Sequence, residues 1–177
     1  CDSEGLIDQL VVCAKGRALQ MNRGANVASG RWLLFLHADT VLSSNWVQAF
    51  GAHINSSDKA AYCNLAFDQT GFMAGFVAAW ANFRSRFFGL PYGDQTLLIS
   101  RKHYNATGGY RDIALMEDVA MARAIGRRKV ALPVTATTNA DSYTQVGWLK
   151  RGRQNLGTLL LYFLGRDPDK LAKRYTR

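Results

Sequence analysis

The sequence predicts a single α/β domain in which helices flank a mostly parallel central sheet. Its clearest strand is the apolar run at 32–36, which shows no alternation, as expected of a strand covered on both faces. A shorter apolar run at 6–12 precedes a helical segment, so the order strand, helix, strand predicts a right-handed crossover and parallel pairing. A length of 177 residues suits one domain with a core of ordinary size.

The elements around the clearest strand follow from local patterns. The segment 18–29 is predicted to be a helix, and Gly30, just past its end, is the expected left-handed cap. Polar residues at 40–45 can cap a second helix at 45–54. A polar break then leads to a predicted strand at 60–68.

A further helix is predicted at 71–90, where six aromatic residues recur at steps near three and four. They are Phe72, Phe76, Trp80, Phe83, Phe87 and Phe88. A stripe of this kind usually lies in a protein core, and burial is the expectation. Arg84 and Arg86 near its end support the alternative of a helix that faces a membrane or covers an acceptor.

The later elements are shorter. A loop at 91–95 is predicted to lead into a strand at 96–100, followed by a short helix at 102–107. A helix at 116–126 has acidic residues in its first turn and basic residues after its last, as the helix macrodipole favours. A late strand is predicted at 130–134.

The end of the chain, 141–177, is a basic, amphipathic tail that we expect to be helical. Its charged residues either form a solvated face or bind an anionic surface. The formal net charge of +9 predicts an anionic partner, and nucleic acid, an anionic membrane and a phosphorylated substrate all satisfy it.

Cysteine usage and hydropathy bear on location. The three cysteines lack the density of a disulfide framework and the spacing of a metal site, which favours free thiols in a reducing cytoplasm. No signal peptide is visible, and the longest nearly uncharged run, 71–83, is too short to span a bilayer. We therefore expect a cytoplasmic protein, with peripheral contact to the inner face of an anionic membrane as an option.

Asp39 lies just beyond the carboxyl end of the strand predicted at 32–36. Ligands of open α/β sheets bind beyond these ends, so Asp39 is well placed to hold a metal ion or a phosphate. Capping of the next helix is the simpler role. Residues 40–45 can supply that cap, which favours a functional Asp39.

Four blocks of sequence together resemble family 2 glycosyltransferases of the GT-A fold. They are GRALQMNRGA (16–25), LLFLHADT (33–40), YGDQ (92–95) and LMEDVAMARAI (115–125). The closest likeness is to the bacterial subgroup named for arsenosugar biosynthesis, in which these blocks recur in this order. The resemblance implies one Rossmann-like GT-A domain that transfers a sugar, with inversion, from a nucleotide diphosphate sugar to a hydroxyl acceptor.

The resemblance also implies roles for individual residues. Asp39 stands as the second carboxylate of the family's metal-binding Asp-x-Asp, where it would hold Mg²⁺ or Mn²⁺ against the diphosphate of a UDP- or GDP-sugar. Asp118 would be the general base for the acceptor hydroxyl, with Glu117 beside it. The implied contacts to the nucleotide and diphosphate are Asp2, Arg17, Asn22 and Ala38.

Two further segments are candidates for substrate contact. In the loop Gly93-Asp94-Gln95, glycine lets the backbone approach a ligand, and the carboxylate and amide suit sugar hydroxyls. An ordinary turn explains this loop nearly as well. Trp148, with the basic residues after it, could fold over the donor phosphates, and a core tryptophan beside surface charge is the equal alternative.

The sequence departs from the family pattern in places. His37 replaces the first carboxylate of the metal motif, and imidazole is a poor ligand for a hard cation. No counterpart of the fold's first strand precedes Cys1, and the interval from Asp2 to Gly16 is short. We therefore expect a leading segment and a loop to be missing from the sequence.

Other functions remain open from the sequence. A sugar nucleotidyltransferase shares the sheet and the metal, but it needs a Gly-rich basic loop that only a leading segment could supply. A basic nucleic-acid-binding α/β domain fits the charge, yet no recognition motif supports it, and we expect no nucleic-acid partner. A fragment with an incomplete nucleotide pocket would be inactive. The oligomeric state, the donor sugar and the acceptor are not predicted.

Overall fold

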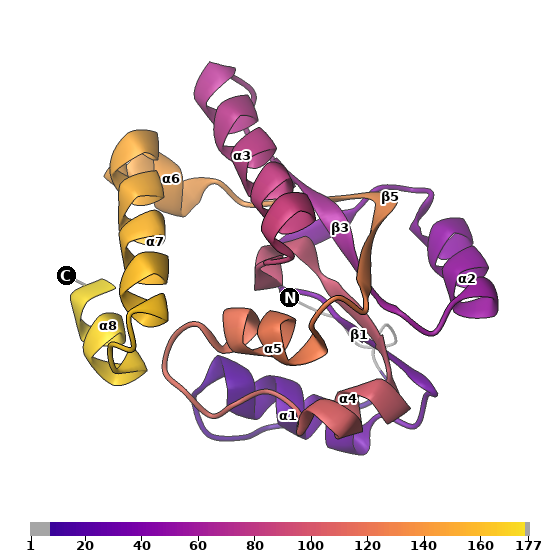
Figure 1. Cartoon of the computed structure of the whole chain (residues 1–177). Helices are drawn as coiled ribbons and strands as arrows, with labels where there is room; N and C mark the ends of the chain where they lie inside the picture. Colours follow the sequence, from indigo (N-terminus) through magenta and orange to yellow (C-terminus); the bar gives the residue numbers. More distant parts are fainter. Residues whose placement is uncertain (1–7, 176–177) are drawn as a thin grey trace.

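The computed structural model of the chain describes residues 8–175, which form helices around a five-stranded mixed sheet that curls into a half-barrel (Figure 1). The strands are β1 (Trp32–Phe35), β2 (Thr40–Leu42), β3 (Ala60–Phe67), β4 (Leu97–Ser100) and β5 (Lys129–Thr138). The helices are α1 (Arg17–Val27), α2 (Trp46–Ser56), α3 (Phe72–Phe88), α4 (Arg101–Thr107), α5 (Glu117–Ile125), α6 (Asp141–Val146), α7 (Trp148–Phe163) and α8 (Pro168–Tyr175), with a short 3₁₀ turn, η1 (Gly93–Gln95).

The sheet is mixed, and the prediction of a mostly parallel sheet is wrong. Its strand order is β1-β4-β3-β5-β2, and of these neighbours only β3 and β5 run parallel. Residues 10–12, in the first predicted strand, belong to no strand and expose Leu10 and Val12, while 6 and 7 lie outside the described residues. The crossover that would have made the sheet parallel is therefore not formed within the described chain.

The strand that the apolar run predicts exists as β1, but it is not covered on both faces. Among the described residues β1 pairs only with β4 and is the edge of the sheet. Leu33 is buried, whereas Leu34 and Leu36 are 38% and 44% exposed. An apolar run therefore predicted the strand correctly and its surroundings incorrectly.

Helices cover both faces of the sheet. On one face α1, α4 and α5, which lie together at the bottom of Figure 1, enclose a core that includes Leu33 and Ile99 from the strands. On the other face, Phe50 of α2 packs with Leu98 and Val134. The helices predicted from periodicity at 18–29, 45–54, 71–90, 102–107 and 116–126 are all confirmed, with shifted ends.

The predicted left-handed cap at Gly30 is wrong. Helix α1 ends earlier, at Val27, and its C-cap residue, Ala28, is extended and donates its backbone N–H to the Gly24 carbonyl. Left-handed glycines instead close α3, at Gly89, and α4, at Gly108.

The predicted burial of the aromatic stripe on α3 is also wrong. The helix rests on β3 through small residues, among which Ala81 and Ser85 are buried. Asn82 binds the backbone of Leu65 twice, accepting its N–H at 2.8 Å and donating to its carbonyl at 3.0 Å. These contacts turn the aromatic side chains away from the sheet, and Phe72 is 85% exposed.

The last three helices form a separate layer at the left of Figure 1. Leu159 of α7 packs against Met116 and Val119 at the start of α5. The tail helices thereby lie beside the edge of the sheet where β1, β3 and β5 end. Within 8–175, no helix combines the length and the apolar character needed to cross a bilayer.

Candidate functional site

A polar cavity of about 290 Å³ lies where the chain leaves β1 and β5 and where α5 begins. Helices α6, α7 and α8 supply its outer wall. The lining residues are Arg17, His37, Asp39, Phe67, Tyr92, Gly93, Asp94, Leu115, Met116, Asp118, Thr138, Asn139, Ser142, Tyr143, Arg151, Asn155 and Tyr175. Charged groups of both signs therefore surround one small space.

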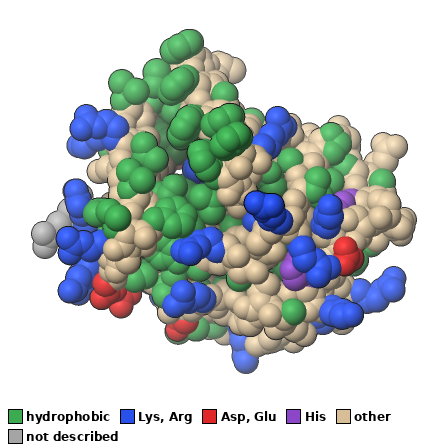
Figure 2. Space-filling view, in the orientation of Figure 1, with side chains coloured by type: hydrophobic (Ala, Val, Ile, Leu, Met, Phe, Trp, Pro, Cys, Tyr) green, Lys and Arg blue, Asp and Glu red, His purple; other side chains and the backbone are tan. Residues whose placement is uncertain are grey.

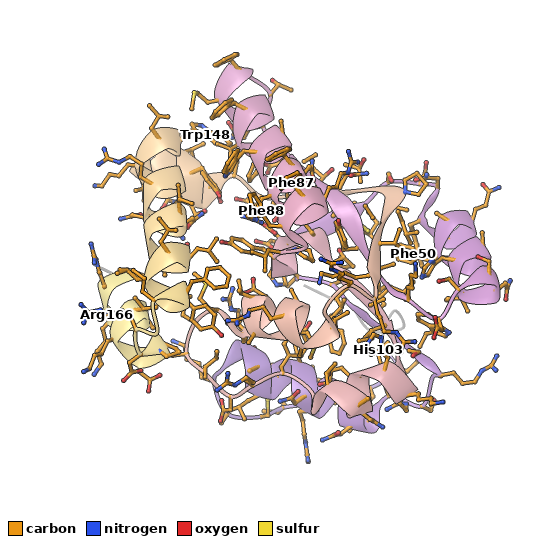
Figure 3. The ribbon with its side chains drawn as sticks, viewed as in Figure 1. Phe50, Phe87, Phe88, His103, Trp148 and Arg166 are labelled. Atoms are coloured by element: carbon orange, nitrogen blue, oxygen red, sulfur yellow. The ribbon has the colours of Figure 1, made fainter. Side chains whose placement is uncertain are left out.

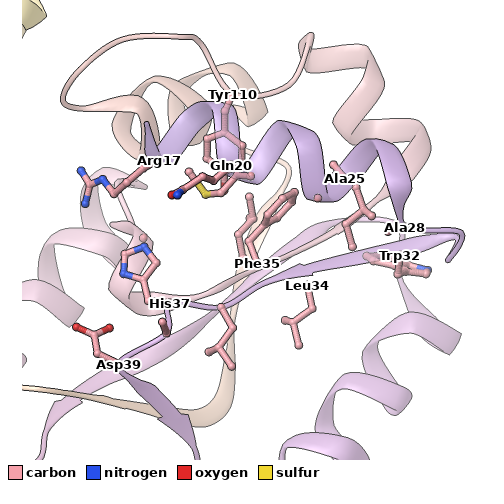
Figure 4. A pocket seen from close by; sticks show the side chains of 17 residues that line it. Arg17, Gln20, Ala25, Ala28, Trp32, Leu34, Phe35, His37, Asp39 and Tyr110 are labelled. Atoms are coloured by element: carbon pink, nitrogen blue, oxygen red, sulfur yellow. The ribbon is translucent and has the colours of Figure 1, made fainter. Parts of the chain in front are cut away.

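A larger cavity, of about 880 Å³, adjoins it between α1 and β1 (Figure 4). Apolar side chains such as Leu34 and Phe35 line most of this space. Arg17, His37 and Asp39 lie at one end of it, where they also line the polar cavity. The two cavities thus meet at a charged junction.

Asp39 occupies the position that its strand predicts. It follows β1, is exposed, and lines both cavities. Its Oδ1 is 3.5 Å from the Thr40 hydroxyl. The chain continues from Asp39 into β2, and the cap residue of α2 is Asn45, so helix capping does not explain Asp39.

Asp118 is the second residue of α5, and two backbone N–H groups hold its carboxylate. Its Oδ2 accepts the Gly93 N–H at 3.0 Å, and its Oδ1 accepts the Val119 N–H at 2.7 Å. Gly93 suits this position because a Cβ would overlap the His37 ring, with Nε2 nearest and Cε1 2.8 Å away. The glycine therefore lets the η1 turn, His37 and Asp118 approach one another.

His37 lies between charges of opposite sign. Burial lowers the pKa of its ring, Arg17 lowers it further, and Asp39 and Asp118 oppose the shift. The neutral imidazole is thereby favoured at neutral pH.

Asp94 is the most perturbed carboxyl group of the cavity. Burial raises its pKa to about 6, Asp118 and Asp39 add to the rise, and Arg84 opposes it. Its Oδ1 is buried without a hydrogen-bond partner. Arg84 itself stacks on the Tyr92 ring, 3.5 Å from the centroid.

The donor set fits a hard divalent cation. Three carboxylates, Asp39, Asp94 and Asp118, face one cavity, and Asp94 has an unsatisfied oxygen. No three His, Cys, Asp or Glu side chains within 8–175 are grouped closely enough to form a complete metal site by themselves. Asp39 could supply a single carboxylate ligand, and Mg²⁺ commonly takes one or two carboxylates and completes its shell with water and substrate phosphates.

Glu117 does not line the cavity. It is 2% exposed and pairs with Arg17, with 2.7 Å between Oε1 and Nε. Burial raises the pKa of its carboxyl, Asp118 adds to this, and Arg17 opposes it. The position of Glu117 is that of a buried anchor that holds Arg17 at the rim of the cavity.

Asn22 and Gln95 are engaged inside the protein and line neither cavity. Asn22 donates to the Tyr110 carbonyl at 2.8 Å and accepts from the Tyr104 hydroxyl, which ties α1 to the chain around α4. Gln95 is fully buried, and its Nε2 donates to the Cys63 carbonyl at 3.2 Å. The hydrogen bonds of both side chains therefore stabilise the fold.

The remaining predicted residues are placed as follows. Ala38 lines the larger cavity. Trp148 lines neither cavity; it stacks on Tyr143 with centroids 5.0 Å apart and packs its edge on Phe67. Asp2 lies outside the described residues.

Several lining residues have no motif to mark them. Asn139, Tyr143, Asn155 and Tyr175 come from the end of β5 and from three different helices of the tail. Arg151, one of the basic residues after Trp148 that the sequence made a candidate, also lines the polar cavity. The only signal in the sequence was the density of basic and aromatic residues after 141. Their position depends on how α7 packs on α5, which local patterns do not reveal.

Comparisons of this chain with protein-family models, with curated proteins and with solved structures give no match. A function therefore has to be inferred from the geometry of the cavity and from the motif blocks that reach it.

Proposed function

We propose that this chain is a metal-dependent glycosyltransferase of the GT-A type, which transfers a sugar from a nucleotide diphosphate sugar to a hydroxyl acceptor. One observation carries the proposal. All four sequence blocks that resemble family 2 glycosyltransferases, 16–25, 33–40, 92–95 and 115–125, contribute residues to the same polar cavity. The convergence of four separate blocks on one cavity supports their serving one site.

The charges of the cavity suit the departure of a diphosphate. Arg17, fixed by its ion pair with Glu117, presents charge-assisted donors to phosphate oxygens. Asp39 would hold Mg²⁺ or Mn²⁺, and the cation would act as a Lewis acid on the leaving diphosphate. The donor's diphosphate would therefore lie at the junction of the two cavities.

Asp118 is our candidate for the general base. Two backbone N–H groups fix its carboxylate at the cavity wall, so the carboxylate keeps the same orientation from one turnover to the next. An acceptor hydroxyl in the polar cavity would lose its proton to Asp118 as its oxygen attacks the anomeric carbon. Attack from the side opposite the diphosphate inverts that carbon.

The neighbouring carboxyl group has a different character. Asp94, with a pKa near 6, is partly protonated at neutral pH and can both donate to and accept from sugar hydroxyls. Asp94 therefore fits acceptor binding, and Asp118 fits the base.

The test is a panel of UDP- and GDP-sugars scored by thermal shift with and without Mn²⁺. We expect one donor to raise the melting temperature only in the presence of Mn²⁺, and Asp39→Asn to abolish that rise. Asp118→Asn should keep the shift and lose transfer by at least about a hundredfold. Asp112→Asn, an exposed carboxylate outside both cavities, is the matched control.

Two results would overturn the proposal. One is the absence of any Mn²⁺-dependent donor in the panel. The other is near wild-type transfer by Asp118→Asn, which would remove the base from the scheme.

A further inference from the structure

Helix α3 carries an exposed aromatic face. Its members recur at intervals of four, four, three and four, so they share one side of the helix, opposite the residues that rest on β3. The aromatic face consists of Phe72, Phe76, Trp80, Phe83 and Phe87. Adjacent rings stack along it, with Phe83 and Phe87 centroids 5.4 Å apart. The most exposed of them, Phe72 at 85% and Phe87 at 72%, add little to the core because they point away from it.

Helix α7, which contacts α3, extends the apolar surface. It exposes a second stripe that shares one side of the helix, composed of Leu149, Leu156, Leu160 and Phe163. Figure 2 shows hydrophobic side chains gathered over α3 and α7, with Lys and Arg side chains around them. Phe87 and Phe88 lie at the end of α3 that adjoins the rest of the molecule, and Arg166 follows α7 (Figure 3).

The charges around this surface are mainly positive. Neither α3 nor α7 contains an acidic residue, and their exposed basic residues are Arg86, Lys150 and Arg153. Beyond α7, exposed Arg166, Lys170 and Arg174 continue the basic rim, which two exposed carboxylates, Asp167 and Asp169, interrupt. Aromatic and aliphatic side chains framed by Lys and Arg are the composition of helices that lie in the headgroup region of anionic bilayers.

We propose that α3 and α7 dock this protein on the surface of an anionic lipid bilayer. The apolar stripes would enter the boundary between headgroups and acyl chains, and the basic rim would contact the anionic headgroups. The charges argue against a second copy of the chain as the occupant, since two molecules of net charge +9 would bring like charges together around the contact. The proposal does not depend on the reaction assigned to the polar cavity.

The test is sedimentation of the full chain with vesicles of phosphatidylcholine and phosphatidylglycerol in equal parts. We expect binding to these vesicles, weaker binding to pure phosphatidylcholine, and release by added salt. The variant Trp80→Gln/Phe83→Gln should bind at least about tenfold more weakly, because two apolar side chains leave the interface. Val41→Gln/Val47→Gln, which removes exposed apolar residues elsewhere, should bind as the wild type does.

Three outcomes would overturn the proposal. The first is no sedimentation with anionic vesicles. The second is the same affinity in the α3 variant and the control, which would mean that binding does not depend on the aromatic face of α3. The third is a stable dimer in light scattering that the α3 variant disrupts, which would assign the surface to a second copy. Matching circular dichroism melts for both variants and the wild type confirm that binding, and not folding, is compared.

Discussion

At the scale of single residues, the protonation of Asp94 affects the stability of the folded protein. Its folded-state pKa of about 6 lies above the ordinary value of 3.8, so the folded protein holds a proton that the unfolded chain releases. The free energy of unfolding should therefore fall as pH rises from about 4 to about 6, by on the order of 3 kcal/mol from this group. Burial is the main cause, because it penalises the charged carboxylate.

The variant Asp94→Asn isolates this effect. It keeps the size of the side chain and removes the charge, so relative to wild type it should gain stability as pH rises through this range and keep the gain at pH 7. Urea unfolding at several pH values, with EDTA present to remove divalent cations, measures the difference. Parallel stability curves for the two proteins would contradict the assigned pKa.

About half of the residues predicted for the site, from their types or from the family resemblance, line the polar cavity. Arg17, Asp39, Gly93, Asp94 and Asp118 do line the polar cavity. A carboxylate or amide in a motif can equally serve the fold, and only the folded chain shows which of the two it faces. The residues that turned out to face the protein interior are Asn22, Gln95 and Glu117.

At the scale of elements, α3 shows what periodicity can and cannot predict. The spacing of its aromatic residues predicted the helix correctly, since any strip of one residue class at this interval marks a helical face. It did not indicate which face meets the sheet. The face that meets the sheet is determined by Asn82, whose amide binds the β3 backbone, and by the small residues Ala81 and Ser85 beside it.

The same helix gives a prediction for stability. Asn82→Ala should lower the free energy of unfolding by about 2 to 3 kcal/mol, because it leaves the Leu65 backbone groups and the Gln95 amide without this partner. Phe76→Gln, on the exposed face, should change it by less than about 0.5 kcal/mol. Guanidinium unfolding of both variants provides the comparison. An equal loss in the two would mean that the aromatic face also supports the fold.

At the scale of the whole molecule, the sequence predicted the alternation of strands and helices but not the pairing of the strands. Local patterns give each strand's position, whereas partner and direction depend on contacts between distant segments. The short strand β2 had no clear signal, and it pairs antiparallel with β5 at the far edge of the sheet. The tail likewise became part of the cavity wall only through the packing of α7 on α5.

The open edge of the sheet has a consequence for the behaviour of the whole molecule in solution. Within 8–175, β1 has one side without a strand partner, and its residue Leu34, which lines the larger apolar cavity, is 38% exposed. Unpaired edges with apolar side chains recruit strands from other chains, and a lysine on such an edge opposes this pairing. We therefore expect Leu34→Lys to slow aggregation of the concentrated protein, measured by light scattering over time. Val47→Lys, at an exposed site on α2, adds the same charge away from the edge and should leave the aggregation rate near that of wild type. If both variants slowed aggregation equally, net charge and not the β1 edge would control the association.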